Sequence, residues 1–248
     1  GGCTALSQKT DVLTGASFLL SVLTKSARSA ILYNTMRATV ITSSDEKAVS
    51  ELVGAFTAQL ASAEIKVWNM SSALTEYCTG CEICVREGET KCRASRSVMP
   101  VWKSMETSDV IVLAFDVYFA GVPASVQNLF DHLRWASMAH RPRPAMRGKR
   151  AVILCSGDGA KGAAKYAADV LRMWGIGSVR VFVRSGTDAA SLAGARLLGL
   201  EFAGIDYDVP ARVTFAMRRR FAAGRRAHSR DSADTLDGAY WRDNDMLK

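Results

Sequence analysis

From residue 36 onward, short apolar runs rich in β-branched residues alternate with longer amphipathic stretches. Runs of this length and composition predict buried strands, and the 3.6-residue apolar period of the longer stretches predicts helices. The expected strands are Thr39–Thr42, Ile65–Trp68, Asp109–Ala114, Arg150–Cys155 and Val179–Arg184. The expected helices are Glu46–Ala61, Val98–Met105, Pro123–Ala139, Ala160–Trp174 and Asp188–Leu198. Strands that are each followed by a helix predict an α/β fold, an open doubly wound sheet of five parallel strands.

Extensions flank this alternation on both sides. We expect residues 1–35 to be a leader or docking segment, residues 36–204 the sheet domain, and residues 205–248 a basic helix and tail. The leader fits an organelle-targeting remnant, an added docking helix or upstream cloning sequence, since it contains a single acid, Asp11. Its longest apolar stretch, Val12–Leu23, is too short to cross a bilayer, so no transmembrane segment is expected. A late helix is expected over Pro210–Ala227, because proline is favoured in a first helical turn.

Composition and charge exclude some classes of protein. With 48% hydrophobic and 23% charged residues, the chain is not disordered as a whole. Seven arginines between Arg212 and Arg230 lie in a stretch without an acid, and removing them from the net charge of +8 leaves +1. They form either a phosphate-binding patch or a solvated face paired with Asp231, Asp234 and Asp237. Few aromatic residues interleave with them, so a nucleic-acid partner is not favoured. The histidines, His132, His140 and His228, match no triad or zinc-hydrolase motif and are expected at the surface or at helix ends.

Four of the six cysteines lie within fifteen positions, in the pattern C-x2-C-x2-C-x7-C. They are Cys78, Cys81, Cys84 and Cys92. Four thiolates are what a [4Fe-4S] cluster needs, and closely spaced cysteines can each bind a different iron. Structural zinc is one alternative, although zinc sites usually use two separated C-x2-C pairs, and free or redox-active thiols without metal are the other. The remaining cysteines, Cys3 and Cys155, are expected to be small apolar core residues.

The loops after the first, third and fourth strands are candidates for a second cofactor, because ligands of such sheets bind beyond the carboxyl ends of the strands. Ser43 and Ser44 can donate hydrogen bonds at a helix start, while Asp45 and Glu46 place negative charge there. Ser156–Gly159 can expose backbone amides to a phosphate or a ring. The alternatives are a plain helix cap by Ser44 or Asp45, and ordinary core packing for the aromatic pair Tyr118 and Phe119.

The cysteine run resembles the iron-sulfur flavoprotein branch of the NADPH-dependent FMN reductase family, together with the segments Asp109–Ala114, Asp116–Phe119, Val122–Val126 and Asp131. The resemblance covers about residues 37–184. It implies a flavodoxin-like fold, a [4Fe-4S] cluster on the four cysteines, and Val117, Tyr118 and Phe119 beside FMN. In such proteins NAD(P)H or another donor reduces FMN, and electrons pass between flavin and cluster.

The chain departs from this family at positions that favour an anionic cofactor. Thr42–Lys47 replaces a Gly-Ser-Pro segment and a longer loop, and Phe115-Asp116 replaces a common Ser-Pro. Gln127 occupies a position where the family often has Lys, and His132 occupies a position where it often has Arg. Each change removes a group that would help to bind FMN.

The sequence therefore predicts an electron-transfer flavoprotein or NAD(P)H-dependent oxidoreductase with FMN and a [4Fe-4S] cluster. The FMN-binding residues are expected to be Ser43, Ser44, Asp116, Val117, Tyr118, Phe119, Ser156, Gly157, Asp158 and Gly159. No side chain is an obvious catalytic acid or base. We expect NAD(P)H or a redox protein as partner, a homo-oligomer or a larger complex, and a cytoplasmic location, with the mitochondrial or plastid matrix as the alternative. The alternative function is a non-catalytic flavodoxin-like subunit of an RNA-containing or organellar assembly, which has lost FMN and keeps a structural metal cluster.

Overall fold

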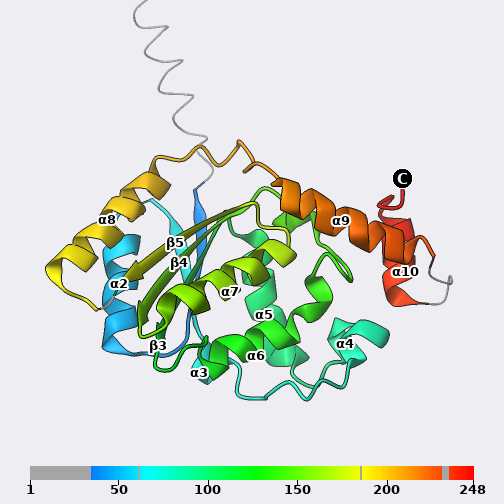
Figure 1. Ribbon diagram of the computed structural model, residues 1–248, viewed down its shortest axis with the longest axis horizontal. Helices are drawn as coiled ribbons and strands as arrows, with labels where there is room; N and C mark the ends of the chain where they lie inside the picture. Colours follow the sequence, from blue (N-terminus) through cyan, green and yellow to red (C-terminus); the bar gives the residue numbers. More distant parts are fainter. Residues whose placement is uncertain (1–34, 61, 185, 231–234) are drawn as a thin grey trace, which may run out of the picture. The chain divides into compact units, whose positions relative to one another are not determined.

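The five predicted strands form one parallel sheet in a computed structural model that describes residues 35–60, 62–184, 186–230 and 235–248. They are β1 (Arg37–Thr42), β2 (Glu64–Asn69), β3 (Val110–Val117), β4 (Arg150–Gly157) and β5 (Ser178–Arg184). The strand order is β2-β1-β3-β4-β5, which is the flavodoxin-like order. Figure 1 shows the sheet between two layers of helices. The predicted fold class is therefore confirmed.

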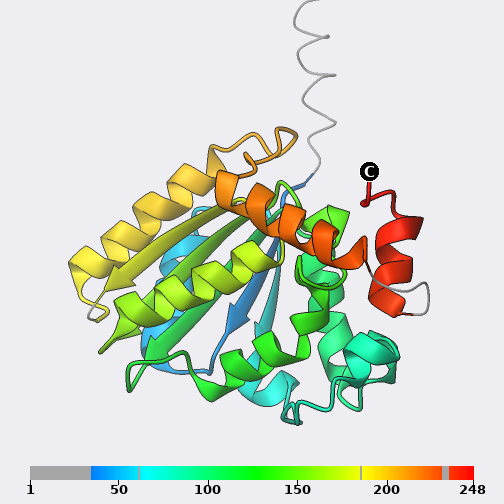
Figure 2. The ribbon, with the colours of Figure 1, turned by 45° about the vertical axis from the view of Figure 1, so that its right-hand side comes forward.

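The helices cover both faces of the sheet. On one face lie α2 (Lys47–Thr57) and α8 (Ala189–Ala203). On the other lie α5 (Ser95–Thr107), α6 (Ala124–His132) and α7 (Ala160–Met173), as Figure 2 shows. The central strand β3 is buried from Val110 to Phe115, as expected of a strand with helices on both sides. Because all strands are parallel, the loops that follow β1, β2, β3 and β4 meet at one edge of the sheet.

Helix α6 ends at His132, so the predicted helix to Ala139 is too long. The chain turns through a 3-10 helix, Arg134–Ala136, and a second one, Pro144–Met146, before β4. Trp135 and Met138 are buried although this segment is irregular, and their burial extends the apolar pattern past the helix. Apolar periodicity alone cannot place such a helix end.

The late helix α9 runs over Phe215–His228, so the prediction that it begins at Pro210 is wrong. Thr214 caps it by accepting a hydrogen bond from the backbone N–H of Met217. The residues before it are extended, because Ala211 N–H donates to the Gly148 carbonyl at 2.9 Å and Pro210 packs against Gly148. A Cβ at Gly148 would lie 2.7 Å from that proline. Helix α10 (Leu236–Asp243) follows α9.

The short helices α3 (Met70–Ala73) and α4 (Ile83–Arg86) and the 3-10 helix Glu89–Lys91 lie between β2 and α5. Residues 36–248 form one compact unit, and the division predicted after residue 204 stays a prediction. The predicted leader and Val12–Leu23 lie outside the described residues. Within the described part of the chain, no helix is both long and apolar enough to span a membrane.

Candidate cofactor sites

The loop after β1 presents the uncapped start of a helix. Ser43 is buried and fixed, since its N–H donates to the Ala114 carbonyl at 3.0 Å and its carbonyl accepts from Ser125 Oγ at 2.8 Å. Ser44 Oγ accepts from the Glu46 N–H at 3.3 Å, and no side chain caps α2. The alternative in which Ser44 or Asp45 caps this helix is therefore wrong. The N–H groups of the first turn of α2 remain available to an anion.

The aromatic pair after β3 lies outside the core. Tyr118 is 71% exposed and Phe119 is 92% exposed, which overturns the core-packing alternative. The pKa of Tyr118 is raised by desolvation of its hydroxyl and by the negative charges of Glu46 and Asp116. The β1 and β3 loops therefore place two carboxylates near one tyrosine. A flat apolar surface and a negative charge lie side by side here.

The loops after β3 and β4 are in direct contact. Ser156 Oγ donates to Asp116 Oδ1 at 2.7 Å, so the hydroxyl of this predicted FMN-binding residue is used within the protein. Gly157 has φ +92°, and a Cβ there would lie 2.1 Å from the Val117 carbonyl oxygen. Gly159 has φ +78°, and its Cβ would lie 2.8 Å from Ala120 Cα. The two glycines thus allow the loops to approach each other, whereas the sequence suggested that they make room for a ligand.

Replacing Gly157 by alanine is expected to destabilise the protein by about 3 kcal/mol, because a side chain costs about 1–2 kcal/mol at this φ and clashes with the neighbouring loop. Urea unfolding of the two proteins measures the difference. Gly162→Ala is the control, since a Cβ at Gly162 meets nothing within 4 Å and alanine favours the helix by up to about 1 kcal/mol. A Gly157→Ala protein as stable as the parent would contradict the close approach.

Helix α6 holds the start of the cysteine loop, residues 74–94. The side chain of Asn128 is buried, its Oδ1 accepts from the Cys78 N–H at 2.9 Å, and its Nδ2 donates to the carbonyls of Leu74 and Glu76. One turn later, His132 Nε2 lies 3.0 Å from the Glu76 carbonyl, and its Nδ1 lies 3.6 Å from Cys92 Sγ. A carbonyl only accepts, so His132 donates from Nε2. One buried face of α6 therefore binds the backbone at the start of the cysteine loop.

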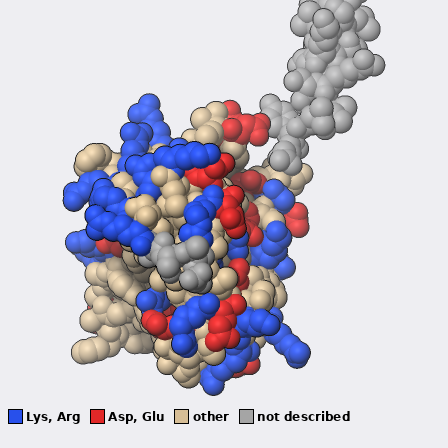
Figure 3. Space-filling model, turned by 90° about the vertical axis from the view of Figure 1, so that its right-hand side faces the viewer, with Lys and Arg blue, Asp and Glu red and all other residues tan. Residues whose placement is uncertain are grey.

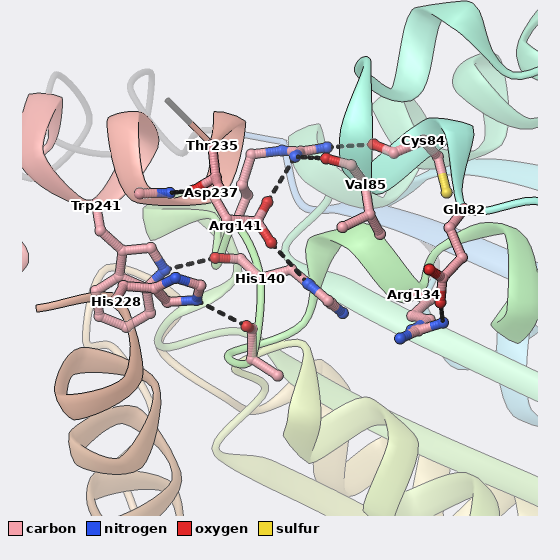
Figure 4. Close-up of polar contacts among 12 residues, drawn as sticks. Glu82, Cys84, Val85, Arg134, His140, Arg141, His228, Thr235, Asp237 and Trp241 are labelled. Carbon is pink, nitrogen blue, oxygen red and sulfur yellow. Dashed lines mark hydrogen bonds and ion pairs between the residues drawn. The ribbon is translucent and has the colours of Figure 1, made fainter. Parts of the chain in front are cut away.

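Arg141 holds the middle of the cysteine loop, as Figure 4 shows. Its guanidinium donates to the carbonyls of Cys84 at 2.5 Å and Val85 at 3.1 Å. It also pairs with Asp237 of α10 at 2.6 Å and with Glu89 at 3.1 Å. The Arg141 side chain is 6% exposed and that of Asp237 is 9% exposed. The loop is therefore clamped between the segment after α6 and the C-terminal helix α10.

Cys84 is a half-buried thiol whose pKa responds to the other three cysteines. Burial raises the pKa of Cys84, and negative charge on Cys92, Cys78 and Cys81 raises it further. A backbone hydrogen bond from Ile83 lowers the pKa of Cys81, which is exposed. Four thiolates this close repel one another, and a cationic metal group removes that repulsion. The donor set fits such a group.

No three His, Cys, Asp or Glu side chains among the described residues converge on a position for one metal ion. Zinc requires such convergence, with each sulfur about 2.3 Å from the ion. In an iron-sulfur cluster each thiolate binds its own iron, so the sulfurs stand farther apart. The side-chain positions of the described residues therefore show neither a zinc site nor a cluster site, and both stay predictions. Cys155 is buried, and burial raises its pKa to about 12, as expected of a core cysteine.

Two of the histidines lie at helix ends, as predicted. His132 ends α6 and His228 ends α9, and both are buried. His140 Nδ1 lies 2.7 Å from Asp237 Oδ2, so Asp237 pairs with His140 and Arg141 and not with the arginines of α9. Asp231 and Asp234 lie outside the described residues.

Sequence reasoning missed Asn128, Arg141 and Asp237, and it gave His132 no role at the cysteines. A signal existed for the first helix, because Asn128 and His132 are four residues apart among apolar positions of α6 and so share a buried face. Nothing in the local sequence marked Arg141 or Asp237, which meet across 96 residues.

Comparisons with known proteins agree with this arrangement. A family model described as NADPH-dependent FMN reductase matches residues 36–191. An iron-sulfur flavoprotein of Archaeoglobus fulgidus is 30% identical over 116 residues, which cover 46% of this chain and 50% of that protein. An iron-sulfur flavoprotein of Methanocaldococcus jannaschii is 36% identical over 75 residues, which cover 30% of this chain and 38% of that protein. The matches therefore span half or less of these relatives.

Solved structures share the fold. An NAD(P)H:quinone oxidoreductase from Methanothermobacter marburgensis has a TM-score of 0.55 at 17% identity, with 69% of this chain and 99% of that chain covered. The azoreductase AzrA has a TM-score of 0.53 at 15% identity, with 67% and 100% covered. At these identities the likeness shows the fold alone.

Proposed function

This chain belongs to the NADPH-dependent FMN reductase family, and we propose that it is an NAD(P)H-dependent flavoprotein oxidoreductase that carries FMN and a [4Fe-4S] cluster. The flavin would lie at the loops after β1, β3 and β4, and the cluster would lie on Cys78, Cys81, Cys84 and Cys92. When bound, FMN accepts a hydride and the cluster carries single electrons, while the protein supplies placement and electrostatics.

The observation that carries this proposal is the position of α6 between the two candidate sites. At its first turn Ser125 binds the β1 loop, and at its last turn His132 contacts Cys92. Seven residues of helix separate these two side chains, a rise of about 10 Å. One rigid helix therefore fixes the cysteines relative to the flavin loops, as electron transfer between two cofactors requires.

The residues of the chain have distinct roles in this proposal. The free N–H groups of α2 would bind the FMN phosphate, since a helix start favours an anion. Tyr118 and Phe119 would cover the ring with apolar surface. Asn128 and Arg141 bind the backbone of the cysteine loop at Cys78 and Cys84.

Purification without oxygen, followed by assay of iron, sulfide and flavin on one preparation, tests the proposal. We expect about four irons and four sulfides with one FMN for each chain. Resolved flavin bands in the blue, above a broad iron-sulfur shoulder, should bleach on addition of NADPH or NADH. A colourless protein would contradict the proposal, and a brown protein without flavin would contradict its FMN part.

The second candidate is a non-catalytic subunit that keeps the fold and a structural cluster. The observation that favours it is the pair of acids Asp45 and Glu46 at the start of α2, where a phosphate dianion would bind. A brown protein without flavin is the result that this candidate predicts. The proposed homo-oligomer and the cytoplasmic location stay predictions.

Replacing Asp45 by asparagine and Glu46 by glutamine together is expected to tighten FMN binding several-fold, with a larger effect at low salt. Each surface charge contributes a few tenths to about 1 kcal/mol, and salt screens it. Quenching of FMN fluorescence on titration of flavin-free protein measures the affinity. Glu51→Gln, one turn farther along α2, is the control and should have little effect. Weaker binding by the double variant would mean that these acids help to hold the flavin.

A further inference from the structure

A cavity of about 410 Å³ lies under the C-terminal helices, away from the candidate flavin loops. Helix α7 begins beside the β4 loop at Ala160 and ends at Met173, and the next residues, Trp174 and Gly175, line the cavity. Fourteen helical residues span about 20 Å. The cavity is therefore about 20 Å from the flavin loops, and its volume is within the range of small-molecule sites.

The interior of the cavity is apolar and adaptable. Its lining includes Met138, Met217, Met246, Trp174 and Phe221. Methionine side chains are flexible and fill irregular space, so they adjust to a flexible apolar ligand. Met217 and Phe221 are four residues apart on α9, which crosses the end of α7 in Figure 2. The wall thus combines a fixed aromatic surface with movable thioethers.

The rim of the cavity is strongly basic. The cationic residues of its lining are Arg143, Arg147, Arg218, Arg225 and Lys248, against one acid, Asp245. Arg143 pairs with Glu89 at 2.8 Å and Lys248 pairs with Asp245 at 2.6 Å. Neither Arg147 nor Arg218 has an ion pair with a carboxylate in the described part of the chain. Figure 3 shows the blue side chains gathered over α9, at the upper left of that face.

We propose that this cavity binds a long-chain carboxylate, with the apolar chain among the methionines and the carboxylate at Arg147 and Arg218. The two arginines come from different segments, the turn before β4 and helix α9, and both line the cavity. Guanidinium groups match a carboxylate in charge and in planar geometry. An apolar pocket without this rim would take neutral ligands equally well, and a rim without the pocket would bind any small anion.

Helix α9 offers a matched control for the charge. Arg218 and Arg225 line the cavity, whereas Arg219 and Arg226 are exposed and do not line it. Replacing Arg219 and Arg226 removes the same charge as replacing Arg147 and Arg218, at positions of α9 that do not line the cavity. A difference between these two double variants therefore reports contact with the ligand rather than the overall charge of this surface.

Calorimetric titration of the full chain with decanoate tests the proposal, with decanol and acetate as probes of the apolar chain alone and the head group alone. We expect decanoate to bind with a dissociation constant of about 10–100 µM, decanol at least about tenfold more weakly, and acetate not measurably. Arg147→Gln with Arg218→Gln should weaken decanoate binding about tenfold or more. Arg219→Gln with Arg226→Gln should change it less than about twofold.

Equal losses in the two arginine pairs, or equal binding of decanol, would overturn the carboxylate contact. Absence of heat with decanoate up to about 1 mM would overturn the site. Ala222→Phe fills the cavity and should abolish binding, and its thermal melting curve tells a filled cavity from an unfolded protein. Iron and flavin contents should be the same in all these variants, because among the described residues none of the replaced side chains forms an ion pair with the cysteine loop or with the candidate flavin loops. A failure of decanoate binding therefore leaves the proposed redox function unaffected. A failure of the iron and flavin assays likewise leaves the proposed carboxylate site unaffected.

Discussion

The Cys84→Ser substitution is expected to abolish iron and sulfide binding while it leaves the flavin content within about twofold of the parent protein. Cys84 is one of the four proposed ligands, and a serine hydroxyl does not supply the thiolate that a cluster needs. The loops proposed to bind FMN follow β1, β3 and β4, whereas Cys84 lies between β2 and α5. Iron, sulfide and flavin assays on protein purified without oxygen measure both contents.

Cys155→Ala is the matched control for the loss of a cysteine. Cys155 is buried, lies at the end of β4 and has a pKa of about 12, so it is a poor thiolate donor. Iron content should be unchanged in this variant. Iron retained by Cys84→Ser would contradict the ligand assignment. Loss of both iron and flavin would mean that the cysteine loop is needed for the fold.

Replacing Arg141 by methionine is expected to lower the free energy of unfolding by about 3–5 kcal/mol. The change leaves Asp237 as a buried carboxylate that has lost its guanidinium partner, and removal of one member of a buried ion pair costs this much. The carbonyls of Cys84 and Val85 also lose their donor. Urea unfolding gives the free energy, and the iron content should fall with it because the backbone at Cys84 is released.

An exposed ion pair provides the comparison for this substitution. Arg180 and Glu201 lie 3.0 Å apart with side chains 57% and 47% exposed. Arg180→Met should cost less than about 1 kcal/mol, as surface pairs usually do. A cost below about 1 kcal/mol for Arg141→Met as well would show that the clamp on the cysteine loop is weak.

The sheet could be predicted because its signal is local. Each strand is a short buried run followed by an amphipathic helix, and the order of such strands is limited to a few arrangements. The predicted element bounds were wrong where a contact with a residue distant in the sequence decides the local structure. The extended path of Pro210 and Ala211 depends on Gly148, some sixty residues earlier, and nothing in the sequence around Pro210 reveals that partner.

The sequence indicated which residue types lie at the candidate sites, but it did not indicate which contacts their side chains make. Cysteine spacing predicts the metal ligands, and this assignment stays a prediction. The glycines after Cys155 indicated a loop with exposed amides, and Gly157 and Gly159 have positive φ angles. The hydroxyl of Ser156 is nevertheless used within the protein, because Asp116 on the adjacent strand accepts from it. A sequence pattern gives the groups that a loop contains, whereas the neighbouring strand decides which of them stay free.

The clamp on the cysteine loop has a consequence for synthesis of the protein. Cys78–Cys92 leaves the ribosome about 145 residues before Asp237, the buried partner of Arg141. While the chain grows, the thiols are therefore present before the ion pair that holds their backbone. Iron supplied to a nascent chain would meet a loop without its final support. Delivery of metal is expected to be most productive once translation has passed α10.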